Sequence, residues 1–194
     1  MKILVTGFKP FLGHDQNPSE RLSVELAQNF SEVESLVLPV EFGRAFEVLN
    51  QHLQQRTYDY IVLLGQAAGR HRISIEKIGL NWAETHQHDE AGLKPVNGPL
   101  VAGAELALMT KFPVDEVIQK LSDLKLPVHV SFSAGTYICN DLYFRAMESH
   151  RDLKIVFVHV PLLPEQKTEF AMNQMGYGQQ LQTLESLIEI TLKR

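Results

Sequence analysis

Short apolar runs alternate with amphipathic segments along most of the chain, and this alternation limits the possible folds more than any other feature. Buried-strand patterns fall at residues 2–6, 33–40, 58–64, 73–78, 128–132 and 154–160. Apolar residues recur at helical spacing within 18–30, 42–53, 114–124, 142–147 and 181–188. Strands that alternate with helices favour a mostly parallel sheet covered by helices on both faces. We therefore predict one α/β domain.

Two local signals refine this pattern. Asn17 before Pro18 is typical of a helix N-cap followed by proline at the first helical position. Residues 81–98 are polar and contain several glycines and prolines, which predicts a long surface excursion. Loops of more than about 12–15 residues are usually functional or disordered, so this excursion is a candidate functional segment.

Composition narrows the classes of function. The 194 residues carry a net charge of −5 with scattered lysines and arginines, which argues against nucleic-acid binding. No stretch approaches the ~18 consecutive apolar residues of a membrane span, and the first apolar run is too short for a signal peptide. We therefore expect a cytoplasmic protein without a membrane partner. The single cysteine, Cys139, excludes an intrachain disulfide and a cysteine-rich zinc site.

Cys139 lies in the segment Ser133-Ala-Gly-Thr-Tyr-Ile-Cys-Asn140, directly after a predicted strand and in the first turn of a predicted helix. Free N–H groups and partial positive charge at a helix N-terminus favour a thiolate over a thiol. The thiolate is the nucleophile of cysteine enzymes. The alternative is a buried, unreactive cysteine that packs as a small hydrophobic side chain, and the residue taken alone favours this alternative.

His159 closes the predicted strand at 154–160. A histidine at this position can act as general base to a thiol and as general acid to a leaving amine. Neighbouring parallel strands would allow it to meet Cys139. The alternative is a histidine whose ring nitrogens are satisfied by local partners.

Glu76 alternates with isoleucines on the predicted strand at 73–78, which we expect to be half-buried. An inward-pointing carboxylate needs a partner, because an unpaired buried charge is costly. A hydrogen bond from His159 would supply that partner and fix the imidazole tautomer. The alternative is an exposed glutamate on an edge strand, paired with Lys77 or Arg72.

Three other motifs carry weaker signals. The loop Gly7–Gly13 follows the first strand but lacks the signatures of a phosphate-binding loop. The segment Gly65–Arg70 could hold an anion on its backbone N–H groups. His86, His88 and Asp89 are metal-ligand types, but one such cluster on a polar loop is more often solvated surface. We expect neither a metal nor a cofactor.

The long motifs occur together in a characteristic order. They are Thr6-Gly-Phe-Lys-Pro-Phe11, Asn17-Pro18-Ser19, Gly65-Gln66-Ala67, Ile75-Glu76-Lys77-Ile78, the Cys139 segment, and Phe157-Val-His-Val-Pro-Leu-Leu-Pro-Glu-Gln166. In this combination the chain resembles the pyroglutamyl peptidase I (pyrrolidone-carboxylate peptidase) family of cysteine peptidases. The motifs span nearly the whole chain, and the cysteine and histidine motifs are long and specific.

The resemblance implies a fold, an activity and a catalytic group. The fold is a three-layer α/β/α sandwich with a twisted sheet, and residues 1–194 form a single peptidase domain. The activity is removal of an N-terminal pyroglutamyl residue from peptides. Cys139 would be the nucleophile, His159 the base and Glu76 the residue that orients the base.

The resemblance also implies a substrate pocket. Phe8 and Phe11 would sandwich the lactam ring, Gln66 would bind its polar edge, and Tyr137 and Ile138 would supply further wall. Aromatic faces suit a small, flat, uncharged ring. The family needs no metal, and its members often assemble as tetramers, which implies a homo-oligomer.

One segment departs from the family's pattern. The family typically has Asp-Ala-Arg-Ile-Pro-Asp-Asn where this chain has Glu84-Thr-His-Gln-His-Asp-Glu90, so His86 replaces an arginine and Gln87 an apolar pocket residue. Arginine keeps its charge, whereas histidine is largely neutral near pH 7. Two alternatives therefore stay open: a divergent amidase for another N-terminal lactam or cyclic amide, and a catalytically quiet protein that binds a small molecule.

Overall fold

The computed structural model describes residues 1–11, 13, 15–166 and 173–194. Its strands are β1 (Ile3–Phe8), β2 (Val33–Leu38), β3 (Tyr60–Gln66), β4 (Ile73–Glu76), β5 (Ile78–Leu80), β6 (Ala107–Met109), β7 (Val128–Ser131) and β8 (Lys154–Val160). Its helices are α1 (Pro18–Asn29), α2 (Arg44–Leu53), α3 (Val114–Asp123), α4 (Ile138–Ser149) and α5 (Tyr177–Leu192). No helix among these described residues is long and apolar enough to cross a membrane.

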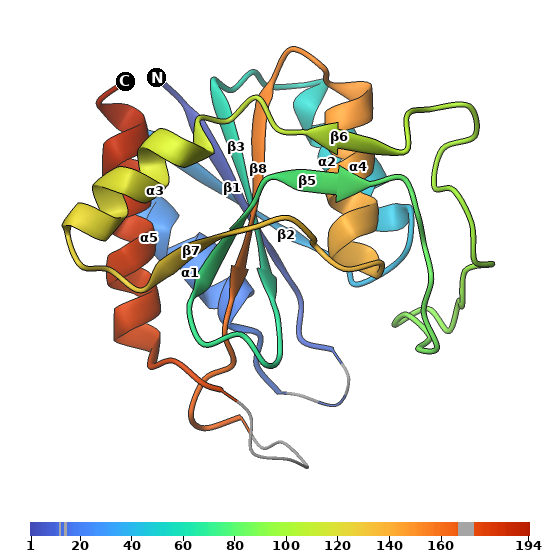
Figure 1. The fold of residues 1–194 in the computed structure, drawn as a ribbon, viewed down its shortest axis with the longest axis horizontal. Helices are drawn as coiled ribbons and strands as arrows, with labels where there is room; N and C mark the ends of the chain where they lie inside the picture. Colours follow the sequence, from blue (N-terminus) through green and yellow to red (C-terminus); the bar gives the residue numbers. More distant parts are fainter. Residues whose placement is uncertain (12, 14, 167–172) are drawn as a thin grey trace.

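The main sheet has six strands in the order β2-β1-β3-β8-β4-β7 (Figure 1). Strands β2, β1, β3 and β8 run parallel to one another. Strand β4 pairs antiparallel with β8 and parallel with β7, so these two strands run the other way. The prediction of a mostly parallel sheet is confirmed, with a reversal of direction between β8 and β4 that the alternating pattern did not indicate.

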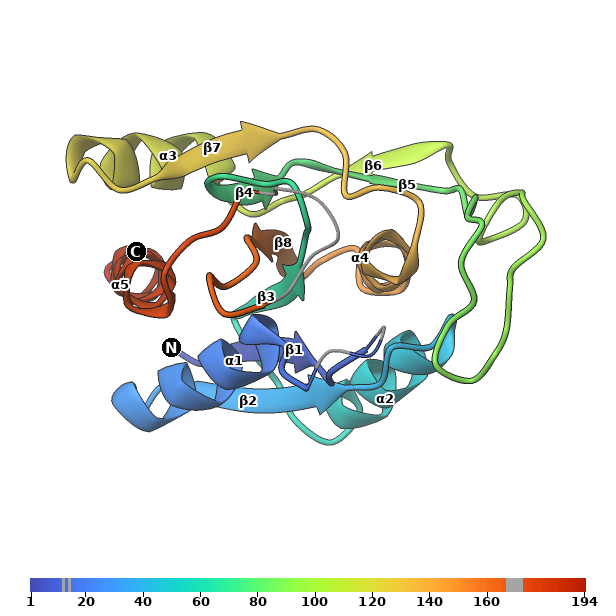
Figure 2. The same cartoon turned by 90° about the horizontal axis from the view of Figure 1, so that it is seen from below.

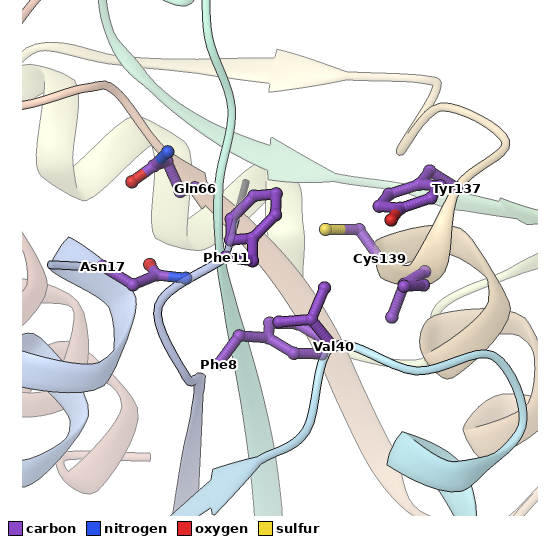
Figure 3. Close-up of a pocket in the computed structure, with 8 residues that line it drawn as sticks. Phe8, Phe11, Asn17, Val40, Gln66, Tyr137 and Cys139 are labelled. Atoms are coloured by element: carbon purple, nitrogen blue, oxygen red, sulfur yellow. The ribbon is translucent and has the colours of Figure 1, made fainter. Parts of the chain in front are cut away.

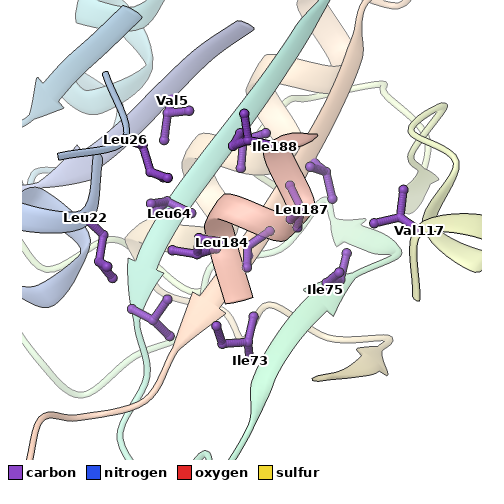
Figure 4. Close-up of a cluster of buried hydrophobic side chains, with 14 of the residues drawn as sticks. Val5, Leu22, Leu26, Leu64, Ile73, Ile75, Val117, Leu184, Leu187 and Ile188 are labelled. Carbon is purple, nitrogen blue, oxygen red and sulfur yellow. The ribbon is translucent and has the colours of Figure 1, made fainter. Parts of the chain in front are cut away.

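Helices cover both faces of this sheet. Helices α1, α3 and α5 pack together on one face, and α2 and α4 pack together on the other (Figures 1 and 2). Each face has its own core of buried apolar side chains, and Figure 4 shows the core that α1 and α5 form with the sheet. Because both faces are covered, β1 and β8 are buried almost throughout, as their continuous apolar runs indicate. The predicted three-layer arrangement is confirmed.

The predicted strand at 73–78 differs most from the structure. It divides into β4 and β5, which lie in different sheets and are separated by Lys77. All four residues of β4 are buried, including Ser74 and Glu76. The prediction of a half-buried strand was therefore wrong: the residues alternate between two faces, but helices or loops cover both. The short strand β6 was not predicted, since its three residues are too few to show a period.

The connection from β1 to α1 is built by hydrogen bonds around the predicted N-cap. The Asn17 side-chain oxygen accepts the N–H of Ser19 at 3.0 Å, which confirms the N-cap. Asn17 Nδ2 donates to the carbonyl of Lys9 at 3.0 Å, and Ser19 Oγ accepts the N–H of Phe8 at 3.1 Å. The helix start thus lies directly against the end of β1. A Cβ atom on Gly7 would lie 2.2 Å from the carbonyl oxygen of Ser19, so only glycine fits there.

Replacing this glycine tests the packing of β1 against α1. We expect Gly7→Ala to lower the free energy of unfolding by about 3 kcal/mol or more, because the added methyl group meets backbone that cannot move aside. Urea denaturation measures the change. The matched control is Gly178→Ala in the first turn of α5, where a Cβ atom meets nothing within 4 Å. This control should be at least as stable as the unmodified protein, and equal effects of the two substitutions would contradict the packing argument.

Candidate active site

The candidate site lies at the edge of the sheet where β1, β3 and β8 end. Cys139 reaches this edge from the first turn of α4, as predicted. The preceding strand β7 is not adjacent to β8, because β4 lies between them. Neighbouring parallel strands, which would have allowed Cys139 to meet His159, are therefore not what connects them.

Helix α4 carries the sulfur over the parallel part of the sheet instead. A Cβ atom built on Gly65 of β3 would lie 2.9 Å from Cys139 Sγ and 2.7 Å from the ring of Phe157. Gly65 is the register partner of His159 across the β3–β8 pairing. The sulfur of Cys139 thus lies against Gly65 of β3, and His159, the predicted base, is the register partner of Gly65 on the neighbouring strand. Because Gly65 has no side chain, the sulfur can approach this closely.

His159 and Glu76 form a buried pair. Their side chains are 5% and 0% exposed, and His159 Nδ1 lies 2.8 Å from Glu76 Oε1. A carboxylate can only accept, so Nδ1 carries the proton and donates it. The ring of His159 also packs on Phe157, with centroids 4.7 Å apart. The predicted contact between these two side chains is present in the structure.

The alternative interpretation of Glu76 as an exposed edge residue was wrong. Strand β4 lies between β8 and β7, and Glu76 is fully buried. Lys77 pairs with Asp115. The cation beside Glu76 is Arg70, whose Nη2 lies 3.5 Å from Glu76 Oε1 and 3.2 Å from the carbonyl oxygen of Ser133.

Two side chains of α4 hold its first turns in place. The Asn140 side chain accepts the N–H of Leu80 at 2.8 Å and donates to the carbonyls of Leu80 and Trp82 at 2.8 and 3.0 Å. The hydroxyl of Tyr143 donates to the carbonyl of Glu76 at 2.9 Å. The helix that carries Cys139 is therefore fastened to the strand that carries Glu76.

A small cavity that is partly open to solvent lies beside Cys139 (Figure 3). All five predicted substrate-contacting side chains line it together with Cys139. Among the described residues, the lining consists of Phe8, Phe11, Asn17, Val40, Gln66, Tyr137, Ile138 and Cys139. The lining is mainly apolar, so the cavity suits a small molecule with few polar groups.

Three residues of this region were not predicted from the sequence. Val40 follows β2 and Asn17 caps α1, and both line the cavity. Gln166 lies behind Gln66 and hydrogen-bonds to it. The only signal for Gln166 was its place at the end of the long histidine motif. Leu12, in the predicted loop Gly7–Gly13, lies outside the described residues.

A helix N-terminus favours a thiolate, but the sequence left the pKa of the Cys139 thiol open. Burial raises the pKa of Cys139 to about 12, and the negative charge of Glu76 acts in the same direction. The backbone N–H of Cys139 lowers the pKa, as expected at a helix N-terminus, but burial outweighs it. The resting group is therefore a thiol, and a base has to remove its proton during reaction.

The polar excursion lies against the cavity wall. The hydroxyl of Tyr137 donates to the carbonyl of His88 at 2.9 Å. Asp89 is buried, and its carboxylate accepts backbone N–H groups, among them that of Phe42 at 3.0 Å. His86 is exposed and is not among the residues that line the cavity. Within the described ranges no three histidine, cysteine, aspartate or glutamate side chains are grouped to hold a metal.

Comparison with known proteins places this geometry in a family. The family model described as "Pyroglutamyl peptidase" matches residues 1–194. The pyrrolidone-carboxylate peptidase of Pyrococcus furiosus is 35% identical over 210 residues, covering 100% of this chain and 99% of that protein. The pyrrolidone-carboxylate peptidase of Thermococcus kodakarensis is 34% identical, covering 100% and 95%.

Solved structures give the same result. A mutant pyrrolidone carboxyl peptidase from Pyrococcus furiosus superposes with a TM-score of 0.91 at 33% identity, covering 100% of this chain and 99% of that one. Pyroglutamyl peptidase I from Bacillus amyloliquefaciens gives 0.90 at 28% identity, covering 96% and 94%. The family model and the relatives agree over the full length of the sequence, and the chain belongs to the pyroglutamyl peptidase family.

Proposed function

We propose that this protein is a cysteine exopeptidase that hydrolyses the bond after an N-terminal pyroglutamyl residue of peptides. The observation that carries the proposal is the cavity beside Cys139, in which two phenylalanines and the side-chain amide of a glutamine line the same space as the sulfur. The family membership supports it, and the family model spans residues 1–194, which we take as a single peptidase domain.

We assign the chemistry to Cys139, His159 and Glu76. His159 donates Nδ1–H to Glu76, so its Nε2 is free to accept the thiol proton. The sulfur then attacks the carbonyl carbon of the pyroglutamyl residue. The tetrahedral intermediate collapses to a thioester as the protonated His159 gives its proton to the departing amine. Water, deprotonated by His159, cleaves the thioester and regenerates the thiol.

The start of α4 supplies donors for the developing oxyanion. The first N–H groups of a helix have no acceptor within the helix, and no side chain caps this one at Tyr137. The N–H of Cys139 belongs to that first turn and adjoins the sulfur. Such fixed donors stabilise the negative charge of a tetrahedral intermediate.

The cavity matches the chemistry of a lactam. Phe8 and Phe11 offer aromatic faces to a flat ring, and Gln66 offers one amide to its polar edge. Among the described residues that line the cavity, none has an acidic side chain. A charged N-terminal amine would therefore lose its hydration there without gaining an ionic partner, which favours pyroglutamyl peptides over peptides with a free N-terminus.

We further propose that the chain works in the cytoplasm as a homo-oligomer, a tetramer by its resemblance to the family. Exposed apolar side chains at Leu106, Met109 and Phe132 support association between copies. The alternative of a catalytically quiet binding protein lacks support. Burying and aligning the His159–Glu76 pair costs folding free energy, and binding a small molecule does not require that pair.

Removing the sulfur tests the nucleophile. We expect Cys139→Ala and Cys139→Ser to abolish release of a fluorogenic amine from a pyroglutamyl amide, because no other group of the cavity can form the thioester. Rates are compared with those on prolyl and glutamyl amides, which should be poor substrates of the unmodified protein. Persistent turnover in both variants would contradict the assignment, and preference for another cyclic amide would favour the amidase alternative.

Alkylation tests the state of the thiol. With a pKa raised to about 12, the thiolate fraction of Cys139 grows about tenfold per pH unit across the neutral and mildly alkaline range. We therefore expect the rate of reaction with iodoacetamide to keep rising up to pH 9.5 in the native protein. The urea-unfolded chain is the control and should level off above about pH 9. A plateau below pH 8 in the native protein would instead indicate a preformed thiolate. Cys139 is the only cysteine, so the signal has one source.

Changing the carboxylate tests the orienting role of Glu76. In Glu76→Gln the amide can donate to His159 Nδ1 and so stabilise the tautomer that protonates Nε2. We expect kcat to fall about 10²–10⁴-fold with little change in KM. Steady-state kinetics with circular dichroism as a folding control measures this. An unchanged kcat in a folded variant would remove Glu76 from the mechanism.

A further inference from the structure

Gln166 is buried and does not line the candidate cavity. Its side-chain amide is hydrogen-bonded to that of Gln66, which does line the cavity. Gln166 is 7% exposed. Its Nε2 donates to Gln66 Oε1 at 2.9 Å and lies 3.3 Å from the carbonyl oxygen of Gln16, while its Oε1 accepts the N–H of Leu163 at 2.8 Å. The two glutamines are 100 residues apart in sequence, so only the fold brings them together.

Backbone groups fix the direction of these bonds. The N–H of Leu163 can only donate, so the atom of Gln166 facing it must be the amide oxygen. The carbonyl of Gln16 can only accept, so the other atom must be the amide nitrogen. That nitrogen in turn requires the oxygen of Gln66 opposite it. The orientation of the Gln66 amide therefore follows from two main-chain groups that cannot exchange roles.

The fixed orientation of the Gln66 amide determines which polar group faces the cavity. Gln66 lines it, and its oxygen is engaged behind the wall by Gln166. Figure 3 shows this oxygen pointing away from Phe11 and Cys139. The group that Gln66 can offer to a bound ring is its NH₂, which is a donor only. A ring that presents a hydrogen-bond acceptor can accept from this NH₂ group. A ring that presents only an N–H places its own donor against the donor of Gln66.

We propose that Gln166 is a positioning residue that holds Gln66 as a donor and thereby makes the cavity selective for a ring carbonyl. This inference rests on the proposed function and deepens it, because the carbonyl of the lactam is what separates a pyroglutamyl residue from an N-terminal proline. Leaving a buried donor without an acceptor is costly enough to discriminate strongly between such rings.

Gln166→Glu is the direct test. A carboxylate cannot donate, so Gln66 has to turn its amide and direct its oxygen into the cavity. We expect KM for a pyroglutamyl amide to rise about tenfold or more with kcat changed less than threefold, since the lost hydrogen bond acts on the bound ring. Gln166→Met, which removes the amide without adding charge, should raise KM less. The matched control is Gln179→Glu on the exposed side of α5, which should leave both constants unchanged.

A double-mutant cycle separates positioning from a structural role. In a Gln66→Met background there is no amide left to orient, so Gln166→Glu should raise KM no further. A residue that only supports the turn at 161–166 would give the same additional loss in both backgrounds. Additive effects in an active enzyme would overturn the inference while leaving the proposed function intact.

Two neutral five-membered rings test the polarity without turnover. Cyclopentanone has an acceptor and no N–H, whereas pyrrole has an N–H and no acceptor of comparable strength. In NMR titrations we expect the ratio of the two affinities to favour cyclopentanone by about tenfold more in the unmodified protein than in Gln166→Glu. Gln166→Met serves if Gln166→Glu does not fold. An unchanged ratio overturns the inference, and because this measurement needs no catalysis, it is independent of whether pyroglutamyl amides are cleaved.

Discussion

The site depends on the junction between β8 and β4, where the direction of the sheet reverses. In the antiparallel register Glu76 lies opposite Phe157, and its side chain reaches the ring of His159 two residues further along β8. Burial on both faces of the sheet keeps water from competing for this hydrogen bond, and it also makes an unpaired carboxylate there expensive. Arg70 and the imidazole both contact Oε1 of this buried carboxylate.

Helix α4, which carries Cys139, is attached to that junction by hydrogen bonds. Tyr143 bonds α4 to the main chain of Glu76, and Asn140 bonds it to β5. With the helix fixed in this way, the sulfur of Cys139 comes to rest on Gly65, beside the strand that carries His159. The same burial that makes the arrangement rigid also keeps the thiol protonated. The structure thus favours a mechanism in which proton removal and attack are linked, rather than one that begins from a stored thiolate.

Different segments of the chain supply the shape and the polarity of the cavity. Phe8 and Phe11 reach it from the end of β1 and the connection to α1, where Asn17 and Ser19 form hydrogen bonds that hold the two elements together. The Gln66 amide comes from the end of β3, where Gln166 hydrogen-bonds to its oxygen. Shape and polarity are therefore set by different segments, and a substitution in one need not disturb the other.

Sequence alone determined most of the elements and the chemical types at the site. Strand 154–160, the N-cap at Asn17 and the placement of Cys139 in a first helical turn are encoded by local periodicity and capping, which act over a few residues. Residue type and position indicated the catalytic candidates, motif resemblance added their roles and the five cavity residues, and the structure brings them to one edge of the sheet. Tertiary structure decided what local patterns do not encode: the reversed β4, the full burial of Glu76, the raised pKa of Cys139 and the contact between Gln66 and Gln166. Each of these depends on which distant segments become neighbours, because strand order, desolvation and the direction of a side-chain hydrogen bond are set by groups far away in the chain.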